Sequence, residues 1–220
     1  MNRTVKYLVG HIYKPLLTRY LSVTRRYTFK GVRLLVPPEV FHPAFFFSTK
    51  LLLRYISQLP LMHNSFLELG AGSGLISIFA SGKGAHVMAT DINPVAIEYL
   101  EKNRQLNLTN FKIIHSDLFE EIPSQEFDII AINPPYYKKK PQTHAEHAWY
   151  CGENGEYFER LFCKLPDYMH VKSVVLMILS DACDLLMIRR MAGKYGCRLN
   201  CVHTSQNLLE KNFIFKIELS

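Results

Sequence analysis

From residue 65 onwards, short apolar runs alternate with longer segments in which apolar residues recur every three or four positions. The short runs have the length of buried strands, and the longer segments have the spacing of amphipathic helices. Predicted strands cover 66–69, 86–90, 111–115, 127–132, 173–179, 197–203 and 212–219. Predicted helices cover 45–56, 74–80, 94–107, 155–165 and 181–196. Strand and helix therefore alternate along most of this part of the chain. An acidic loop instead of a helix joins the strands 111–115 and 127–132, and the last two strands also have no helix between them.

This alternation predicts an α/β fold of the Rossmann-like type. Strands that alternate with helices form βαβ units, which give a mainly parallel sheet with helices on both of its faces. The seven strands are expected to form one sheet. The final two, at 197–203 and 212–219, are expected to pair antiparallel because no crossover helix separates them.

The N-terminal part of the chain follows a different pattern. Apolar residues at helical spacing predict a helix over 3–21, which Pro15 kinks or splits. A short hairpin is predicted next, with strands at 27–29 and 32–36 and a turn that contains Gly31.

Positive charge is concentrated in the same part of the chain. The formal net charge is +7, but residues 1–50 hold nine basic residues and a single acid, Glu39. This asymmetry favours a polyanionic partner for the segment, and a solvated basic face explains it equally well. We therefore divide the chain into 1–40, a basic helix and hairpin interpreted as a substrate-binding segment, and 41–220, the main domain.

Cysteine content and hydropathy indicate the compartment. The five cysteines are an odd number without a CxxC pair, which is typical of free thiols in a reducing environment. No apolar run reaches about 18 residues, so we expect no membrane span. We expect a cytoplasmic protein, although the basic, acid-free N-terminus is also compatible with an organellar transit peptide. His144 and His147 have no evident third ligand, so we expect no metal site.

The loops that follow four of the strands carry the candidate chemistry. In a parallel sheet these loops lie on one edge, where ligands bind near the point at which the strand order reverses. The first loop, GAGSG, contains Gly70, Gly72 and Gly74, and glycine lets the backbone approach a ligand closely. Leu75 stands where the dinucleotide fingerprint requires its third glycine. The loop therefore favours a ligand with an adenosine and an amino acid but no phosphate, and a simple tight connection is the alternative.

Two acids end the next two strands. Asp91 lies about twenty residues beyond the glycines, where a carboxylate accepts hydrogen bonds from ribose hydroxyls. Its alternative role is to cap the helix that begins near Pro94, which Asn93 suits better. Asp117, with Ser116 beside it, either accepts from an adenine amino group or is an ordinary surface acid.

The last loop, NPPYYKKK, offers two acceptors beside an aromatic ring. The side-chain carbonyl of Asn133 and the backbone carbonyl of Pro134 accept hydrogen bonds, and Pro134 and Pro135 hold φ at about −65°. An NH2 group has two donors that match these acceptors, and Tyr136 supplies a flat surface for stacking. We therefore predict that these four residues hold a planar amine or amide. The alternative is a Pro-Pro strand terminator.

Together, the segments LELGAGSG, ATDINP, SDLF and NPPY resemble the motifs of class I S-adenosylmethionine-dependent methyltransferases. The NPPY form resembles the branch that methylates exocyclic or amide nitrogens, which contains adenine amino-methyltransferases and the HemK/PrmC glutamine methyltransferases. The stretch CGENGEYFERLF is similar to a HemK/PrmC segment, with Cys151 in place of its first glycine. Ser48 and Thr49 stand where relatives carry an acid and a threonine that close over the cofactor.

The resemblance implies S-adenosylmethionine as cofactor and a set of site residues in the main domain. The residues implied to be catalytic are Asn133, Pro134, Pro135 and Tyr136. Those implied to bind the cofactor are Thr49, Glu68, Gly70, Gly72, Gly74, Asp91, Ile92, Ser116, Asp117 and Asn133. Those that we expect to bind the substrate are Tyr137, Lys138, Lys139 and Lys140.

We therefore predict an enzyme that transfers a methyl group to a planar nitrogen. The first candidate acceptor is a glutamine amide in a protein of the release-factor or ribosomal type, which the CGENGE stretch favours. The alternative is the exocyclic amine of adenine in RNA or DNA, which the basic N-terminus and the lysine run favour. Two further alternatives are an inactive scaffold that binds RNA or a partner subunit, and a nicotinamide oxidoreductase, against which Leu75 argues.

Overall fold

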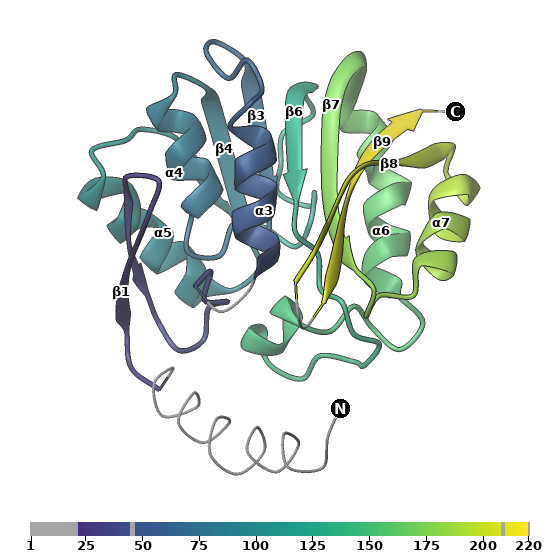
Figure 1. Cartoon of the computed structure of the whole chain (residues 1–220), viewed down its shortest axis with the longest axis horizontal. Coiled ribbons are helices and arrows are strands. Elements are labelled where there is room, and N and C mark those ends of the chain that lie inside the picture. The colour runs from purple at the N-terminus through teal and green to yellow at the C-terminus, as the bar shows by residue number, and fades with distance from the viewer. Residues whose placement is uncertain (1–21, 45–46, 208–209, 220) are drawn as a thin grey trace.

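The computed structural model (Figure 1) describes residues 22–44, 47–207 and 210–219. Its main feature is a seven-stranded sheet with the strand order β5-β4-β3-β6-β7-β9-β8. The strands are β3 (Ser65–Leu69), β4 (His86–Asp91), β5 (Lys112–His115), β6 (Phe127–Ile132), β7 (Met169–Ser180), β8 (Cys197–Gln206) and β9 (Lys211–Leu219). Pairs from β5 to β7 are parallel, and β9 runs antiparallel to β7 and β8. The expected sheet with its antiparallel C-terminal strand is confirmed.

Helices cover both faces of the sheet, as the alternating pattern predicts (Figure 1). In the part of the chain that the structure describes, they are α3 (Phe47–Ile56), α4 (Leu75–Gly82), α5 (Pro94–Leu106), α6 (Glu156–Lys164) and α7 (Leu185–Lys194), with two short 3₁₀ helices, η2 (His144–Ala148) and η3 (Leu165–Tyr168). Helices α3, α4 and α5 pack on one face, and α6 and α7 pack on the other. Successive residues of a strand point to opposite faces, so Ile129 and Ala131 join the first core and Ile130 and Ile132 join the second.

The predicted hairpin is present and docks on α5. Its strands are β1 (Arg25–Phe29) and β2 (Val32–Val36), which pair antiparallel. The side chain of Asn103 on α5 makes both hydrogen bonds that a neighbouring strand would make with Leu35. Its Oδ1 accepts from the Leu35 N–H at 2.7 Å, and its Nδ2 donates to the Leu35 carbonyl at 2.9 Å. The same Nδ2 donates to the Ser73 carbonyl in the glycine loop at 2.9 Å. One buried amide therefore links the hairpin, the helix and the loop.

Two further predictions concern the N-terminal part: a helix over 3–21 and a domain boundary at residue 40. The predicted helix over 3–21 lies outside the described residues. Leu34 of the hairpin belongs to the same buried cluster as α3, α4 and α5, so the hairpin shares a core with the main domain. The division at residue 40 and the role of 1–40 stay predictions.

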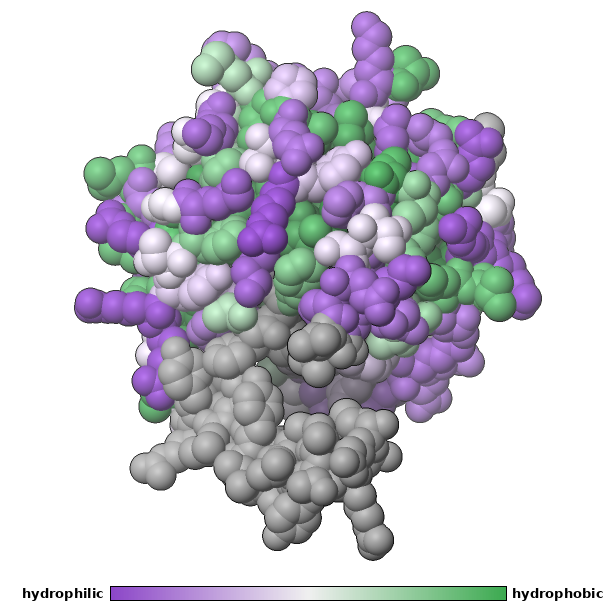
Figure 2. All heavy atoms as spheres, viewed as in Figure 1, coloured by the Kyte–Doolittle hydropathy of each residue, from purple (hydrophilic) through white to green (hydrophobic). Residues whose placement is uncertain are grey.

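The surface is mixed in character. Figure 2 shows that hydrophilic side chains cover much of the visible face, with hydrophobic ones scattered among them. No helix in the described part of the chain is both long and apolar enough to cross a membrane.

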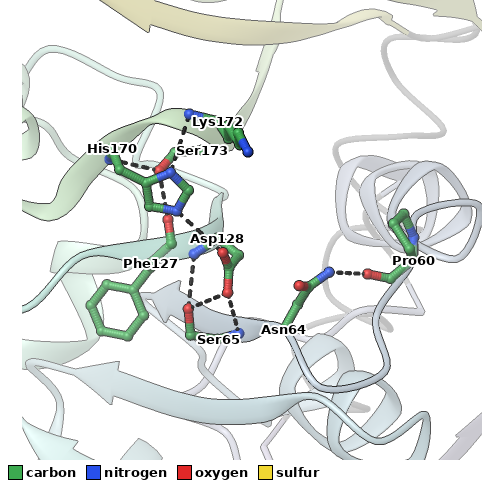
Figure 3. A network of polar contacts seen from close by, with 8 residues as sticks. All are labelled: Pro60, Asn64, Ser65, Phe127, Asp128, His170, Lys172 and Ser173. Atoms are coloured by element: carbon green, nitrogen blue, oxygen red, sulfur yellow. Dashed lines mark hydrogen bonds and ion pairs between the residues drawn. The ribbon is translucent and has the colours of Figure 1, made fainter.

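Figure 3 shows a polar network at the edge of the sheet where the parallel strands begin. Asp128 of β6 accepts hydrogen bonds from the backbone N–H and the hydroxyl of Ser65 on β3, at 2.8 and 2.7 Å. Its other oxygen pairs with His170 Nε2 on β7 at 3.2 Å, and His170 Nδ1 accepts from the Lys172 N–H at 3.1 Å. Because Nδ1 accepts, the neutral imidazole carries its proton on Nε2. One carboxylate therefore joins three neighbouring strands.

The opposite edge contains the point at which strand order reverses. From β3 the chain continues to β4 and then β5 on one side of β3, and it returns to place β6 on the other side of β3. Leu69 at the end of β3 pairs with Ile132 at the end of β6, so the loops after them leave the sheet at the same height. Loops that diverge in this way open a crevice, which is where ligands bind in α/β sheets.

Candidate active site

A cavity of about 210 Å³ lies in this crevice, between the glycine loop after β3 and the loop after β6. The segment before α3, the first turn of α3 and η2 complete its walls. The predicted site residues that line it are Thr49, Glu68, Gly70, Gly72, Asp91, Ile92, Ser116, Asp117, Asn133, Pro134, Pro135, Tyr136 and Tyr137. The predicted site residues outside its lining are Gly74, Lys138, Lys139 and Lys140. The four strand-end loops therefore meet as expected.

The glycine loop turns sharply because its residues adopt a left-handed backbone. Gly70 and Gly72 have φ of 71° and 55°, a region that residues with a Cβ rarely adopt. The Gly72 N–H donates to Asp91 Oδ2 at 2.8 Å, which ties the loop to the end of β4. Gly74 precedes α4 as its N-cap, and a Cβ at this position would lie 3.1 Å from Leu100 of α5. Gly74 therefore permits close helix packing, and the cofactor contact that the resemblance implies for it stays a prediction.

Asp91 orders the loops with both of its carboxylate oxygens. Oδ2 of Asp91 accepts from the Gly72 N–H, and Oδ1 accepts from the Asn93 N–H at 2.8 Å. Burial raises the pKa of Asp91, and these backbone donors oppose the shift. Asn93 caps α5 by accepting from the Val95 N–H at 3.0 Å, as the sequence predicts, so Asp91 remains directed at the cavity. Each carboxylate oxygen keeps a second lone pair for a ligand hydroxyl.

Glu68 lies beneath the glycine loop and is buried. Its Oε2 accepts from the N–H of Ser77 on α4 at 2.8 Å and also from the Ser77 hydroxyl. Burial raises the pKa of Glu68 to about 8 in spite of these hydrogen bonds. A cationic group in the cavity would favour the charged carboxylate, because opposite charges attract strongly where water is scarce.

Asp117 is held by Arg160 of α6, a residue that the sequence analysis missed. Arg160 donates to Asp117 Oδ2 at 2.8 Å and to Glu120 Oε1 at 2.7 Å. The Ser116 hydroxyl turns back on its own loop, where it donates to the Leu118 carbonyl at 3.0 Å. The carboxylate of Asp117 is therefore fixed at the cavity wall, whereas Ser116 orders the loop beside it.

Asn133 follows β6 directly, and its carboxamide is oriented from two sides. Its Nδ2 donates to the hydroxyl of Thr49 at 3.1 Å and to that of Ser48 at 3.4 Å, both in the first turn of α3. Its Oδ1 accepts from the Tyr136 hydroxyl at 3.2 Å. Because the α3 hydroxyls engage the donor end of the amide, the oxygen faces away from them and has a lone pair left for a ligand donor. The half-buried Asn133 lines the cavity and is not turned into the core.

Aromatic side chains form much of the remaining wall. Burial raises the pKa values of Tyr136 and Tyr157, so both phenols are neutral and can donate hydrogen bonds. Trp149 packs against Phe41, with ring centroids 5.1 Å apart. Phe41, Trp149 and Tyr157 were not predicted from the sequence as site residues. The available signal was that Trp149 is the only tryptophan of the chain and follows the NPPY loop.

The lysine run does not reach the cavity. Lys138 Nζ pairs with Asp184 Oδ2 at 2.6 Å, and Lys139 Nζ pairs with Glu146 Oε1 at 3.4 Å. Lys140 is exposed. Two of the three positive charges expected to bind substrate are therefore matched by carboxylates of the protein itself.

His144 and His147 both line the cavity mouth, with ring centroids 6.4 Å apart. Burial lowers the pKa of His147, so this imidazole is neutral near pH 7. The described residues contain no group of three or more side chains arranged to hold a metal ion. The expectation of a metal-free site stays a prediction.

The charge of the lining decides what kind of ligand fits. Five carboxylates line the cavity: Glu39, Glu68, Asp91, Asp117 and Glu210. Among the described residues that line it, none is a lysine or an arginine. Carboxylates repel the negative charge of a phosphate group, so this lining argues against the pyrophosphate of a dinucleotide. It suits a ligand that carries hydroxyls, an amino group and positive charge.

The fold and this cavity are those of a class I methyltransferase. Residues 32–151 match the family model of the methyltransferase small domain. The match covers more than half of the chain, so the chain belongs to the methyltransferase small domain family. The HemK/PrmC-like resemblance read from the motifs is confirmed, and the chain is an S-adenosylmethionine-dependent methyltransferase.

Individual relatives agree with this assignment. The protein described as "Putative protein N5-glutamine methyltransferase MJ0928" from Methanocaldococcus jannaschii is 35% identical over 158 residues, 69% of this chain and 78% of that protein. "Methyltransferase HEMK2" from Homo sapiens is 29% identical over 144 residues, 59% of this chain and 67% of that protein. A chain of the E. cuniculi Mtq2–Trm112 complex, responsible for methylation of the translation termination factor eRF1, has a TM-score of 0.64 at 22% identity. That match covers 83% of this chain and 99% of the other, and it supports the fold.

The residues present fit the cofactor. S-adenosylmethionine carries a sulfonium, an ammonium and two ribose hydroxyls but no phosphate, which matches a lining with carboxylates and no lysine or arginine in its described part. The raised pKa of Glu68 is consistent with a carboxyl group that lacks a cationic partner in this structure.

Proposed function

We propose that this methyltransferase transfers a methyl group from S-adenosylmethionine to the side-chain amide nitrogen of a glutamine in a protein. The observation that carries the proposal is the orientation of the Asn133 carboxamide by the hydroxyls of Thr49 and Ser48. The Asn133 oxygen, the nearby Pro134 carbonyl and the ring of Tyr136 suit a flat group with two N–H donors. A glutamine amide has this shape and these donors.

The acceptor nitrogen needs help because its lone pair is delocalised into the carbonyl group. In the proposed mechanism, Asn133 Oδ1 and the Pro134 carbonyl each accept a hydrogen bond from one N–H group of the substrate amide. These hydrogen bonds favour a pyramidal nitrogen with a directed lone pair. Orientation of reacting groups is worth about 7–11 kcal/mol in well-aligned systems. Bound S-adenosylmethionine supplies the electrophilic methyl carbon. The nitrogen loses one proton to water after it has gained the methyl group, so the site needs no strong base.

The cofactor contacts are part of the same proposal. We assign Asp91 to the ribose hydroxyls, Asp117 to the adenine amino group and Glu68 to the amino-acid end. The wall residues that complete this half of the site are Thr49, Gly70, Gly72, Ile92 and Ser116. Gly74 is left out of the assignment because it packs on α5.

The charge around the cavity mouth supports a protein acceptor. Lys138 and Lys139 are paired with carboxylates, and Glu210 stands at the cavity wall. A nucleic-acid backbone is bound mainly through unpaired cationic side chains. The M. jannaschii relative carries the description "Putative protein N5-glutamine methyltransferase MJ0928", and the Mtq2–Trm112 complex is described as responsible for methylation of a translation termination factor. We therefore infer that the substrate is a translation factor or a ribosomal protein.

Adenine in RNA is the second candidate acceptor. The observation in its favour is the N-terminal charge, because residues 1–50 hold nine basic residues and one acid. Such a segment would also bind a protein substrate that is associated with RNA, such as one on the ribosome.

We also propose that the protein works in the cytoplasm. The support is its five cysteines, Cys151, Cys163, Cys183, Cys197 and Cys201, which are all free thiols. Free thiols persist in a reducing compartment.

The acceptor class is tested by incubating the purified protein with S-adenosylmethionine labelled in its methyl group and a cell extract. The labelled extract is then divided and treated with protease or with RNase. We expect protease to destroy the labelled macromolecule, RNase to leave it intact, and mass spectrometry to locate the methyl group on a glutamine nitrogen.

The control is Asn133→Ala, which should label nothing although it still binds the cofactor in calorimetry. Label that disappears with RNase would replace the glutamine assignment by adenine. Equal loss of cofactor binding and labelling in Asn133→Ala would contradict the role given to this side chain.

A further inference from the structure

A short extended segment leads away from the acceptor site. The N–H of Tyr137 donates to the Trp149 carbonyl and its own carbonyl accepts from the Cys151 N–H, both at 2.9 Å. Two residues further on, the Lys139 carbonyl accepts from the Gly152 N–H at 3.1 Å. The segment therefore behaves as a short strand whose odd-numbered residues pair with the chain beside it.

The other side of this segment has no partner. In an extended chain, residues two apart direct their backbone groups to the same side. Lys138 and Lys140 therefore direct their N–H and carbonyl groups away from 149–152, and no residue that the structure describes is hydrogen-bonded to them. Both residues are exposed. We call these backbone groups of Lys138 and Lys140 the open edge.

Lys140 brings an exposed positive charge to the open edge, whereas its two neighbours are already paired with carboxylates. The ammonium group of Lys138 is paired with Asp184, and that of Lys139 is paired with Glu146. What the open edge offers is an alternating row of backbone donors and acceptors. Such a row is the template on which another extended chain pairs.

The position of the open edge decides its occupant. It starts next to Tyr137, which lines the cavity and follows Tyr136, the residue hydrogen-bonded to Asn133. A side chain that enters the cavity between Asn133 and Tyr136 brings its main chain to the mouth, where the open edge begins. A polypeptide has the matching N–H and carbonyl groups, whereas a sugar–phosphate backbone has no N–H donors.

We propose that an extended segment of the substrate protein pairs with the open edge as an added strand while its glutamine side chain enters the cavity. This inference rests on the proposed function and adds the way in which the substrate is bound. Main-chain hydrogen bonds supply affinity in this mode of recognition, and pockets for side chains supply specificity.

The test compares Lys138→Pro with Lys138→Ala. Both variants lose the ion pair with Asp184, but only proline removes the N–H of the open edge. Proline is compatible with the segment because the preceding residue, Tyr137, is already extended. Equal cofactor affinity and equal melting temperature of the two variants establish that both are folded.

Two acceptors are used for each protein. One is a pool of nonapeptides with a central glutamine and randomised flanks, and the other is N-acetylglutamine methylamide, whose main chain is too short to lie along the open edge. We expect the KM for the nonapeptides to be about tenfold higher in Lys138→Pro than in Lys138→Ala, the scale expected for one lost main-chain hydrogen bond. We expect kcat/KM for the short acceptor to be equal in the two variants.

The outcomes separate the two levels of inference. If the wild type methylates the nonapeptides and the two variants do not differ, the proposed pairing of substrate with the open edge is overturned while the glutamine assignment stands. If the wild type methylates no glutamine peptide, the proposed function falls and the open edge falls with it. Self-association of the wild type that Lys138→Pro abolishes would assign the open edge to a second copy of the chain and would overturn the proposal.

Discussion

Single residues at the cavity order one another before any ligand binds. The hydroxyls of Ser48 and Thr49 hold the donor end of the Asn133 amide, and the Tyr136 hydroxyl contacts its oxygen. Without these contacts the amide could rotate so that its nitrogen and oxygen exchange places. Asn133 would then present an N–H donor to the substrate amide, whose own N–H groups need a hydrogen-bond acceptor. The α3 hydroxyls remove this ambiguity, so we regard Thr49 as a positioning residue for Asn133.

Thr49→Val should therefore lower kcat by about fivefold, because the amide loses its nearer acceptor, and a hydrogen bond is worth about 1 kcal/mol. Thr49→Ser is the matched control, since it keeps the hydroxyl and should retain most of the activity. Steady-state methylation of the substrate identified in labelled extract supplies kcat and KM. Equal activity of the valine and serine variants would show that the hydroxyl does not position the amide.

At the scale of elements, the site depends on segments that are far apart in sequence. Helix α3 supplies the hydroxyls for Asn133, and α6 supplies Arg160 for Asp117. Helix α5 supports the hairpin and the glycine loop through Asn103, whose side chain is fully buried. The hairpin is therefore part of the structural support of the cavity, whatever the role of the chain that precedes it.

Asn103→Ala should lower the free energy of unfolding by roughly 2–6 kcal/mol. The buried Ser73 carbonyl loses its partner at about 1–3 kcal/mol, and the part-buried N–H and carbonyl of Leu35 lose theirs at about 0.5–1.5 kcal/mol each. Cofactor affinity should fall as well, since Ser73 lies in the glycine loop. Urea denaturation and calorimetry measure the two effects.

Asn107→Ala is the matched control for this variant. Asn107 makes similar bonds to the backbone of Arg33, but in an exposed position where water can replace them. Its loss should therefore have a clearly smaller effect on unfolding. An equal loss in the two variants would mean that burial of Asn103 is not the source of its contribution.

At the scale of the whole molecule, the cavity and the polar network that links the strands lie at opposite edges of the sheet. The C-terminal edge of the parallel strands carries the cavity, and the opposite edge carries the Asp128 network (Figure 3). Hydrogen bonds from Ser65 lower the pKa of Asp128, so the folded state favours the ionised carboxylate. Its stabilising effect is complete above the unfolded-state pKa, which is about 3.9, and is lost as pH falls through the lower folded-state value.

Asp128→Asn should lower the free energy of unfolding by about 1 kcal/mol at pH 7, a modest value because the carboxylate is partly exposed. The asparagine keeps one acceptor for Ser65, but its NH2 group would face the Nε2–H of His170, whose Nδ1 is engaged by Lys172. The difference from the wild type should shrink as the pH falls below about 3.9 and the wild-type carboxyl becomes protonated. Urea denaturation at several pH values measures it.

Asp167→Asn serves as the comparison, because Asp167 is an exposed carboxylate at 3.9 Å from Lys164. Exposed pairs of this kind contribute little to stability. A loss in Asp128→Asn that is independent of pH would contradict the assignment to its ionised form.

Much of the fold follows from local patterns. Apolar runs separated by amphipathic segments predict the strands and α-helices of the main domain within a few residues, but not the short 3₁₀ helices η2 and η3. The missing helix before β9 predicts its antiparallel pairing. The rule that loops of a parallel sheet share one edge predicts that Gly70, Asp91, Asp117 and Asn133 line one cavity. These features depend on short-range periodicity, which a single sequence contains.

Other features depend on partners that no local pattern identifies. The Thr49 hydroxyl lies 84 residues from Asn133 in sequence, and Arg160 lies 43 residues from Asp117. Gly74 belongs to a motif but packs on Leu100, and Lys138 belongs to a basic run but pairs with Asp184. In each case the side chain's surroundings are set by the packing of distant elements.

The sequence by itself therefore determined the order of strands and helices and the edge of the sheet that carries the cavity, because backbone geometry and hydrophobic burial act over short stretches. Only the tertiary structure decided which way the Asn133 amide faces, which charges near the mouth are already paired and which backbone groups stay open. Those properties arise from contacts between segments that meet only after the chain has folded around its core.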